Sequence, residues 1–199
     1  MKNIKIKLLL LTSLVFLLPI IPGLILWNKL PQTMAIHFNI NNVADNFAPK
    51  WVVVFVLPAL MAVFQVISCV ITDINVKKQK KSMTPELIAK WIIPILSIVL
   101  QAVTLGYSLG YNIDVRRIVI CLVGVIFVAI GNYLPKLDYV KNKNISPQKA
   151  QKINRFVGIL TFVMGLGAIV TVFLPSVASV IWLILLIPYA IACAVCGMK

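Results

Sequence analysis

The sequence predicts an all-α polytopic membrane protein with six transmembrane helices, cytoplasmic termini and one longer external loop, for which a short β-hairpin is plausible. The first observation is composition: of 199 residues, 61% are hydrophobic and 12% charged, against roughly 45–50% and about 25% in soluble domains. The second is that the apolar residues form runs of about 18–22 residues, enough to cross a hydrocarbon layer roughly 30 Å thick. The third is the uneven placement of the basic residues.

The apolar runs give six predicted spans, of which the first resembles a signal peptide in one respect. It follows three lysines, as the core of a signal peptide would. However, it is longer than the usual core of roughly 7–15 residues, and no A-x-A-like cleavage site precedes the polar loop. We therefore expect it to be retained as a transmembrane helix. The six predicted spans are residues 8–28, 52–72, 88–110, 116–134, 156–174 and 178–197.

The basic residues predict the orientation of these spans. Fifteen of the 19 lysines and arginines lie on the side of the two chain ends, and the other side has Lys29, Lys50, Arg116 and Arg117. Because short cytoplasmic loops carry an excess of Lys and Arg, both termini are predicted to be cytoplasmic and the loop after the first span external. Because most of the net charge of +14 lies on the predicted cytoplasmic side, it is explained by topology, and we expect no direct contact with nucleic acid.

The spans are expected to form one compact membrane domain made of two stretches. Residues 1–72 hold the first two spans and an external loop at 31–50, whereas residues 73–199 hold four spans and basic cytoplasmic loops at 73–87 and 135–155. Each basic loop contains a hydroxyl residue followed by proline, which is the signature of a helix start. The loop lysines either reach anionic lipid head groups or only fix the topology.

Polar residues inside the spans offer little chemistry. Gln65 and Gln101 suit hydrogen bonds between helices, and the ionisable residues lie near span ends. Ion-coupled transporters and intramembrane proteases usually need ionisable groups at depth. Cys193 and Cys196 form a C-x-x-C in an apolar helix, where small buried hydrophobes are a simpler interpretation than a metal or redox site. We therefore expect no enzyme, no catalytic residue, no metal site and no cofactor.

The external loop has the alternating pattern of a half-buried strand. Ile36, Phe38 and Ile40 would face one way and the polar residues between them the other. Two asparagines follow, and Asn is the non-glycine residue best suited to the left-handed conformation of tight turns. A hairpin alone is marginal, so it should pack on the outer ends of the first two spans, with Phe38 and Phe47 turned toward helix ends or lipid. The loop is either an ordered cap or a recognition surface.

The stretch LPQTMAIHFNINNVADNFAPK resembles the external His-Phe-Asn loop that precedes the domain of the SdpI-type bacteriocin immunity family. Asn42 stands where that family usually has a glycine turn. GNYLPK at 131–136 and INRFVG at 153–158 are similar to two further family motifs, but the segment between them lacks the Gly-Ile-Arg and Trp of the family pattern. The matching loop residues are Leu30, Pro31, His37, Phe38, Asn39, Asp45 and Lys50.

The resemblance implies a bacterial cell-membrane protein that protects its cell from a secreted, membrane-active peptide toxin. It also implies a second partner, a cytoplasmic transcriptional repressor that the toxin-occupied protein captures at the membrane. Anionic head groups at the basic cytoplasmic loops are a third expected contact. The implied toxin-recognition residues are His37, Phe38, Asn39, Asn42, Asp45, Phe47 and Lys50, and the cytoplasmic motif residues are Asn132, Pro135, Arg155 and Gly158.

Two other functions stay open. The chain could be a membrane sensor of the same family without a toxin partner. It could also be a small-molecule transporter, although the lack of charge at mid-span counts against an ion-coupled one.

Overall fold

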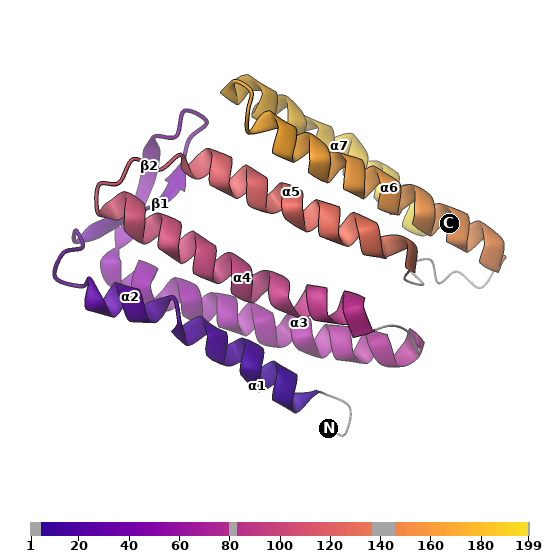
Figure 1. The fold of residues 1–199 in the computed structure, drawn as a ribbon, viewed down its shortest axis with the longest axis horizontal. Coiled ribbons are helices and arrows are strands. Elements are labelled where there is room, and N and C mark those ends of the chain that lie inside the picture. The colour runs from indigo at the N-terminus through magenta and orange to yellow at the C-terminus, as the bar shows by residue number, and fades with distance from the viewer. Residues whose placement is uncertain (1–4, 80–82, 137–145, 199) are drawn as a thin grey trace. The chain divides into compact units, whose positions relative to one another are not determined.

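The computed structural model of the protein describes residues 5–79, 83–136 and 146–198 (Figure 1). Within them, six helical segments are long and apolar enough to cross a membrane, so the predicted multi-pass helical class is confirmed. The contacts divide the chain into two compact units, residues 1–116 (unit 1) and 117–199 (unit 2), which are described separately. The six segments are Ile6–Ile25, Val52–Ile74, Glu86–Ser108, Val115–Tyr133, Pro147–Thr171 and Ser176–Cys196.

The first span of unit 1 is interrupted where it contains two prolines. Pro19 caps the second half of the span and Pro22 lies in that half's first turn, so two backbone donors are missing within one turn. The helix accordingly changes geometry at this point. Its parts are α1 (Ile6–Leu14), the 3-10 turn η1 (Val15–Leu17) and α2 (Ile20–Ile25).

The second span begins with a π-helical turn, η2 (Val52–Val56), and continues as α3 (Leu57–Gln79). In this turn the N–H of Leu57 donates to the carbonyl of Val52. Pro58 has no N–H for the carbonyl four residues before it, and the wider turn lies at that position. Gly23 of α2 packs against it so closely that an added Cβ would lie 2.6 Å from Cγ1 of Val54.

The third span, α4 (Met83–Ser108), packs along α3, and α1 contacts both helices. α4 begins at Met83, the first residue of the described segment 83–136. The predicted Thr84-Pro85 start signal follows directly after it. Unit 1 therefore has two ends. The amino-terminal end holds the first turns of α1 and α4 and the last turns of α3, and the hairpin end holds the opposite ends of these helices (Figure 1).

The predicted hairpin is present at the hairpin end. Strands β1 (Thr33–Phe38) and β2 (Ala44–Pro49) pair antiparallel, and the register is irregular between Ala35 and Phe38. Such a bulge changes which side chains share a face. Met34 and Ala35 are both buried, whereas Ile36 and Ile40 are exposed. The face that Ile36, Phe38 and Ile40 were predicted to share is therefore not buried at Ile36 and Ile40.

The hairpin end has its own apolar core. Met34 and Ala48, which are opposite one another in the register, pack with residues from the adjoining helices. A two-stranded sheet needs such a partner to be stable. The buried members of this cluster are Leu30, Met34, Ala48, Val53, Val54 and Leu105.

Unit 2 holds most of the fourth span, α5 (Val115–Tyr133), the 3-10 turn η3 (Leu134–Lys136), α6 (Pro147–Thr171) and α7 (Ser176–Met198). The side chain of Ser146 accepts the N–H of Lys149, so the predicted Ser-Pro start of α6 is confirmed. Ile120, Ala168 and Trp182 form its core. The Trp182 indole also donates to the carbonyl of Met164 at 2.9 Å.

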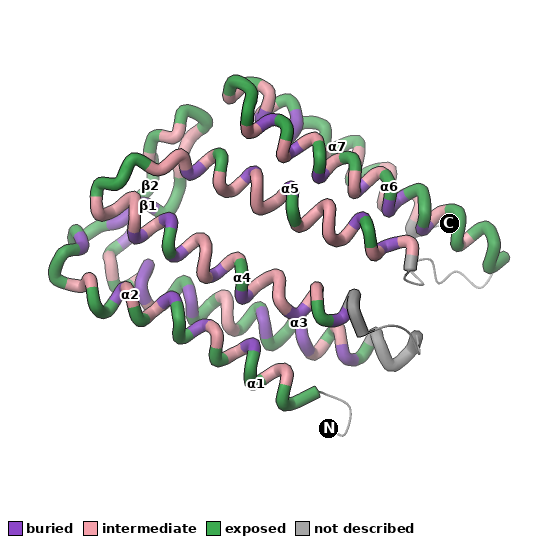
Figure 2. Tube along the Cα trace, in the orientation of Figure 1, coloured by how far each residue is buried: buried purple, intermediate pink, exposed green. Residues whose placement is uncertain are grey.

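Along the spanning helices, buried and exposed residues alternate (Figure 2). Many of the exposed residues are large and apolar, including Leu10, Ile25, Phe173 and Ile187. A soluble protein rarely shows apolar surface of this extent, whereas lipid tails are as apolar as leucine itself. The exposed faces are those of helices in contact with lipid.

Candidate functional site

The turn of the hairpin is built by Asn39. Its side-chain oxygen accepts the backbone N–H groups of Asn41 and Val43, both at 3.0 Å. Its own N–H donates to the carbonyl of Val43 at 2.9 Å. An asparagine that bonds the backbone two residues ahead is a common turn device. The side-chain oxygen and the backbone N–H of Asn39 thus both form hydrogen bonds within the loop.

Asn42 fixes the turn to a distant part of unit 1. Its φ of 61° is the only positive value at a non-glycine residue among the described parts of the chain, so the predicted left-handed Asn turn is confirmed. Its side-chain oxygen accepts the N–H groups of Val115 and Arg116, at 2.8 and 3.3 Å. Its amide donates to the carbonyl of Ile113 at 2.9 Å. Asn42 therefore caps the first turn of α5, whose N–H groups have no partner within the helix.

Substitutions at Asn42 should separate its two roles. Asn42→Ala loses the cap and strains the positive φ, and we expect it to lower the free energy of unfolding by about 1–3 kcal/mol. Asn42→Gly keeps the backbone conformation and loses only the cap, so its cost should be smaller. Asn42→Asp keeps the acceptor and should cost least. The order can be measured by titrating the purified protein from mild detergent into SDS. Equal costs for Asp and Ala would show that capping is not the reason.

Two aromatic contacts hold the rest of the hairpin on the helices. The ring of Phe38 meets that of Tyr107 of α4 edge to face, with centroids 4.7 Å apart. The ammonium of Lys50 donates to the carbonyl of Trp27 at 3.2 Å and lies 4.7 Å from the centre of its indole ring. Phe38 is thus turned onto a helix as predicted, and Lys50 serves to join β2 to the end of the first span.

His37 and Asp45 remain on the surface of the hairpin. Nδ1 of His37 lies 2.5 Å from a carboxylate oxygen of Asp45, and the two side chains are 66% and 43% exposed. Phe47 is also exposed, so it does not turn toward the helices. The outward part of the hairpin therefore combines one polar pair with large apolar groups. We call this set the exposed hairpin residues: Ile36, His37, Ile40, Val43, Asp45 and Phe47.

A second polar site, at the amino-terminal end, was not predicted. The ammonium of Lys90 lies 2.5 Å from Asp73 and 2.8 Å from Glu86, and all three side chains are buried. Lys5 extends this ion cluster, because its ammonium lies 2.6 Å from the other oxygen of Glu86 and its backbone N–H donates to Asp73 at 3.1 Å. The cluster (Lys5, Asp73, Glu86, Lys90) thus ties the start of α1, the end of α3 and the start of α4 together.

A proline enlarges this polar region by freeing a backbone carbonyl. In an α-helix the carbonyl of Lys90 would accept the N–H of residue 94, but Pro94 has none. The side-chain amide of Gln65 donates to that carbonyl instead, at 2.7 Å, and to Cys69 Sγ. Thr12 of α1 contacts the same sulfur at 3.9 Å. Gln65, Cys69 and Asp73 are spaced four residues apart and so form one stripe of α3.

The matching stripe on α4 runs nearly the full length of the span. At 100° per residue, Glu86, Ser97, Gln101 and Ser108 lie within about 40° of Lys90 around the helix. Glu86, Ser97 and Gln101 are buried, as is the hydroxyl of Ser108. This spacing was readable in the sequence. It was missed because Glu86 was assigned to the last residues of a basic loop and Lys90 to the first turn of the third span, where charges are usually solvated.

Two of the four motif residues, Pro135 and Gly158, meet inside unit 2. An added Cβ on Gly158 of α6 would lie 2.6 Å from the Pro135 ring and 2.9 Å from the carbonyl of Gly131. The stretches 131–136 and 153–158 are therefore in contact, and their glycines allow the two helices to approach closely. Asn132 and Arg155 are exposed.

The basic residues at the start of α6 are exposed, whereas Lys90 is not. Lys149, Lys152 and Arg155 recur every three residues and lie on the surface of the helix. Both alternatives for the loop lysines, contact with head groups and a purely topological role, stay open for these residues. Lys90, at the start of the third span, is instead buried in the ion cluster. Residues 80–82 and 137–145 of the predicted basic loops lie outside the described residues.

The geometry defines a multi-pass membrane protein with a small docked hairpin after its first span. A family model described as "Domain of unknown function (DUF1648)" matches residues 14–62, which run from the last residue of α1 through the hairpin into α3. This segment carries all seven loop residues predicted from sequence. No curated protein and no solved structure matches the chain significantly.

Proposed function

We propose that the protein is an immunity protein of the cell membrane that protects its cell from a secreted, membrane-active peptide. The observation that carries the proposal is the hairpin, whose backbone and inner side chains are fixed to the helices while a mixed polar and apolar set points outward. Fixing a binding surface in advance lowers the entropy lost when a partner binds. The distribution of basic residues supports an external position for the hairpin.

The exposed hairpin residues suit an amphipathic peptide. His37 and Asp45 offer a donor and an acceptor to polar groups of a ligand, and an exposed pair of this kind contributes only about 0–1 kcal/mol to stability, so it can exchange partners at little cost. Phe47 is 54% exposed and provides a large rigid apolar surface. An apolar peptide that lies at the membrane surface could contact both groups at once.

Survival of a sensitive strain tests this proposal. Cells that express the chain should survive exposure to the cognate peptide, and candidate peptides can be screened on that basis. Expression that leaves sensitivity to every candidate peptide unchanged, with the protein confirmed in the membrane, would refute the function. Uptake of small solutes by proteoliposomes above the empty-liposome background would favour transport instead.

Variants of the exposed pair test the hairpin as the recognition surface. We expect His37→Ala and Asp45→Ala each to lower protection without lowering the protein level, because neither side chain is needed for folding. Lys29→Ala is the matched control, since it removes an exposed charge at the same end of unit 1. Full protection by both variants would mean that the hairpin is only a cap.

Sensing is a second candidate function, and α4 favours it. Tyr107, near one end of this helix, contacts the hairpin, and Glu86 and Lys90, near the other end, belong to the ion cluster. The helix thus joins the two sites over about 30 Å. Within the described residues, Gln101 Nε2 and Ser108 Oγ have no hydrogen-bond partner, so a shift of α4 can form bonds as well as break them. Movement of the ion cluster could then change the surface offered to a cytoplasmic repressor.

A further inference from the structure

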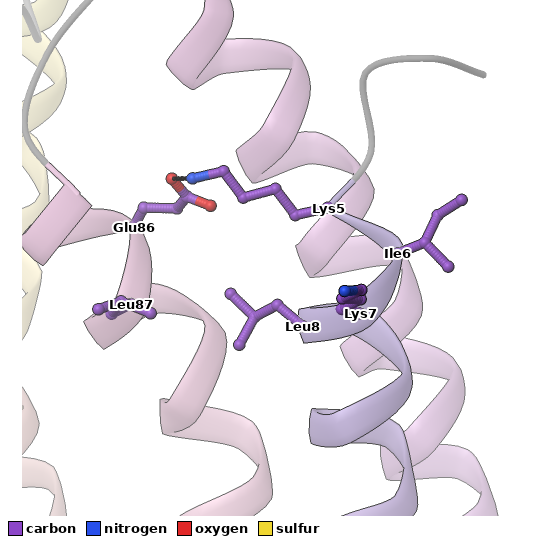
Figure 3. A pocket seen from close by; sticks show the side chains of 6 residues that line it. All are labelled: Lys5, Ile6, Lys7, Leu8, Glu86 and Leu87. Carbon is purple, nitrogen blue, oxygen red and sulfur yellow. Dashed lines mark hydrogen bonds and ion pairs between the residues drawn. The ribbon is translucent and has the colours of Figure 1, made fainter.

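A pocket lies at the amino-terminal end of unit 1, between the first turns of α1 and α4 (Figure 3). Its volume is about 530 Å³, within the range of roughly 300–1,000 Å³ found for small-molecule sites. It is separate from the hairpin, and ligand binding at it is no part of the immunity function proposed above. The lining residues are Lys5, Ile6, Lys7, Leu8, Glu86 and Leu87.

The pocket has one charged edge and apolar walls. The ion pair between Lys5 and Glu86 bridges the two helices, with its charged atoms 2.6 Å apart. Leu8 extends from α1 toward α4, and Leu87 lines the pocket from the first turns of α4 (Figure 3). A ligand that fills this space must therefore have an apolar part that packs between the leucines and a polar part at the ion pair.

The position of the pocket points to a lipid. Ile6 and Glu86 are the first residues of their apolar segments, so the pocket lies where a hydrocarbon layer gives way to head groups. Lysines at this level place their stems along apolar surface and their ammonium groups among the head groups. One acyl chain between the leucines would keep the lipid's head group next to Lys5 and Lys7.

The charges select an anionic head group. Both oxygens of Glu86 already bond to lysines, one to Lys5 and the other to Lys90. Lys7 is exposed beside them, which leaves the lining with an excess positive charge. Negatively charged lipids are attracted to lysines at a membrane surface, and each lysine contributes on the order of 1 kcal/mol.

We propose that this pocket binds an anionic phospholipid, with one acyl chain between Leu8 and Leu87 and the phosphate at Lys7 and Lys5. Binding would brace α1 against α4 next to the ion cluster. A lipid that binds only the folded protein stabilises it by an amount that grows with the logarithm of its concentration divided by its Kd. Occupancy can therefore be followed through the unfolding temperature.

Thermal unfolding of the purified full-length protein in detergent tests this site. Added phosphatidylglycerol should raise the unfolding temperature progressively with its concentration, and phosphatidylcholine with the same chains should raise it less. Lys7→Gln should weaken the apparent affinity for phosphatidylglycerol about fivefold, the contribution of one lysine. Leu87→Trp should also weaken it, by filling the space of the acyl chain.

Lys152→Gln is the matched control, because it removes an exposed lysine of α6, outside the pocket. It should leave the apparent affinity unchanged, whereas a loss equal to that of Lys7→Gln would reduce the effect to general surface charge. Equal shifts from the two lipids would overturn the selection of an anionic head group. A shift produced by glycerol phosphate alone would assign the site to a free anion. The last three outcomes (an equal loss in Lys152→Gln, equal shifts from the two lipids, and a shift from glycerol phosphate alone) contradict the proposal. None of them tests the function proposed for the hairpin.

Discussion

Replacing Lys90 by alanine should lower the free energy of unfolding by about 3–5 kcal/mol, because it leaves the carboxylates of Asp73 and Glu86 without the buried cation that pairs with both. Asp73 and Glu86 would then share Lys5, whose side chain is half exposed. The loss can be measured by titration from mild detergent into SDS, with helix content by circular dichroism as the readout. Lys152→Ala removes an exposed lysine and should change stability by less than about 0.5 kcal/mol.

A compensated variant distinguishes the charge effect from lost packing. If burial of unpaired charge causes the loss, neutralising the partners should recover most of it. Lys90→Met combined with Asp73→Asn and Glu86→Gln keeps the side-chain volumes and removes the three buried charges of the ion cluster. This triple variant should be close to the native protein in stability. A triple variant as unstable as Lys90→Ala, or a Lys90→Ala variant that loses less than about 1 kcal/mol, would contradict the role given to the ion cluster.

Gly131→Ala should lower the free energy of unfolding by about 1–3 kcal/mol, the usual cost of overpacking. The added Cβ would meet backbone atoms of α6, at 2.8 Å from the carbonyl of Gly158 and 2.8 Å from the Cα of Phe162. Backbone cannot move aside as a flexible side chain can. The same SDS titration measures the change, and helix separation can be followed by pairs of labels on α5 and α6.

Gly167→Ala is the matched control for this close approach. It lies on the same helix as Gly158, but its added Cβ would come no nearer than 3.5 Å to the ring of Trp182, which is ordinary contact. Alanine also favours a helix over glycine by about 1 kcal/mol, so this variant should be neutral or more stable. Opposite signs for the two substitutions are expected. Destabilisation of similar size in both would mean that the contact between the two motifs does not limit the packing of α5 and α6.

The spans and the turn of the hairpin were predictable from sequence because each depends on local properties. Run length decides whether a segment can cross a membrane, and two adjacent asparagines favour a left-handed residue at Asn42. The facing of Ile36 and Ile40 was not predictable. It depends on a bulge in the strand register, which no single residue of β1 specifies.

The ion cluster was harder to find, because its members are far apart in sequence and ordinary one by one. Asp73 lies at the end of one apolar run, Glu86 lies at the start of the next helix, and Lys5 belongs to the basic N-terminal segment. Only the stripes on α3 and α4 connect them, and those stripes become informative once the two helices are known to pack together. The contacts of Asn42 and Lys50 with distant segments could not be predicted either. Their polar atoms bond to backbone groups, which leave no trace in the sequence pattern.

The cap that Asn42 places on α5 has a consequence for how the protein is made. Its partner Ile113 is 71 residues further along the chain, which takes about 4–14 s to synthesise at roughly 5–20 residues per second. The hairpin is therefore complete in sequence well before the segment that fixes its turn has been translated. During biogenesis the loop must wait, incompletely docked, until the connection between the third and fourth spans is inserted, and its final surface forms only in chains that have threaded four helices correctly.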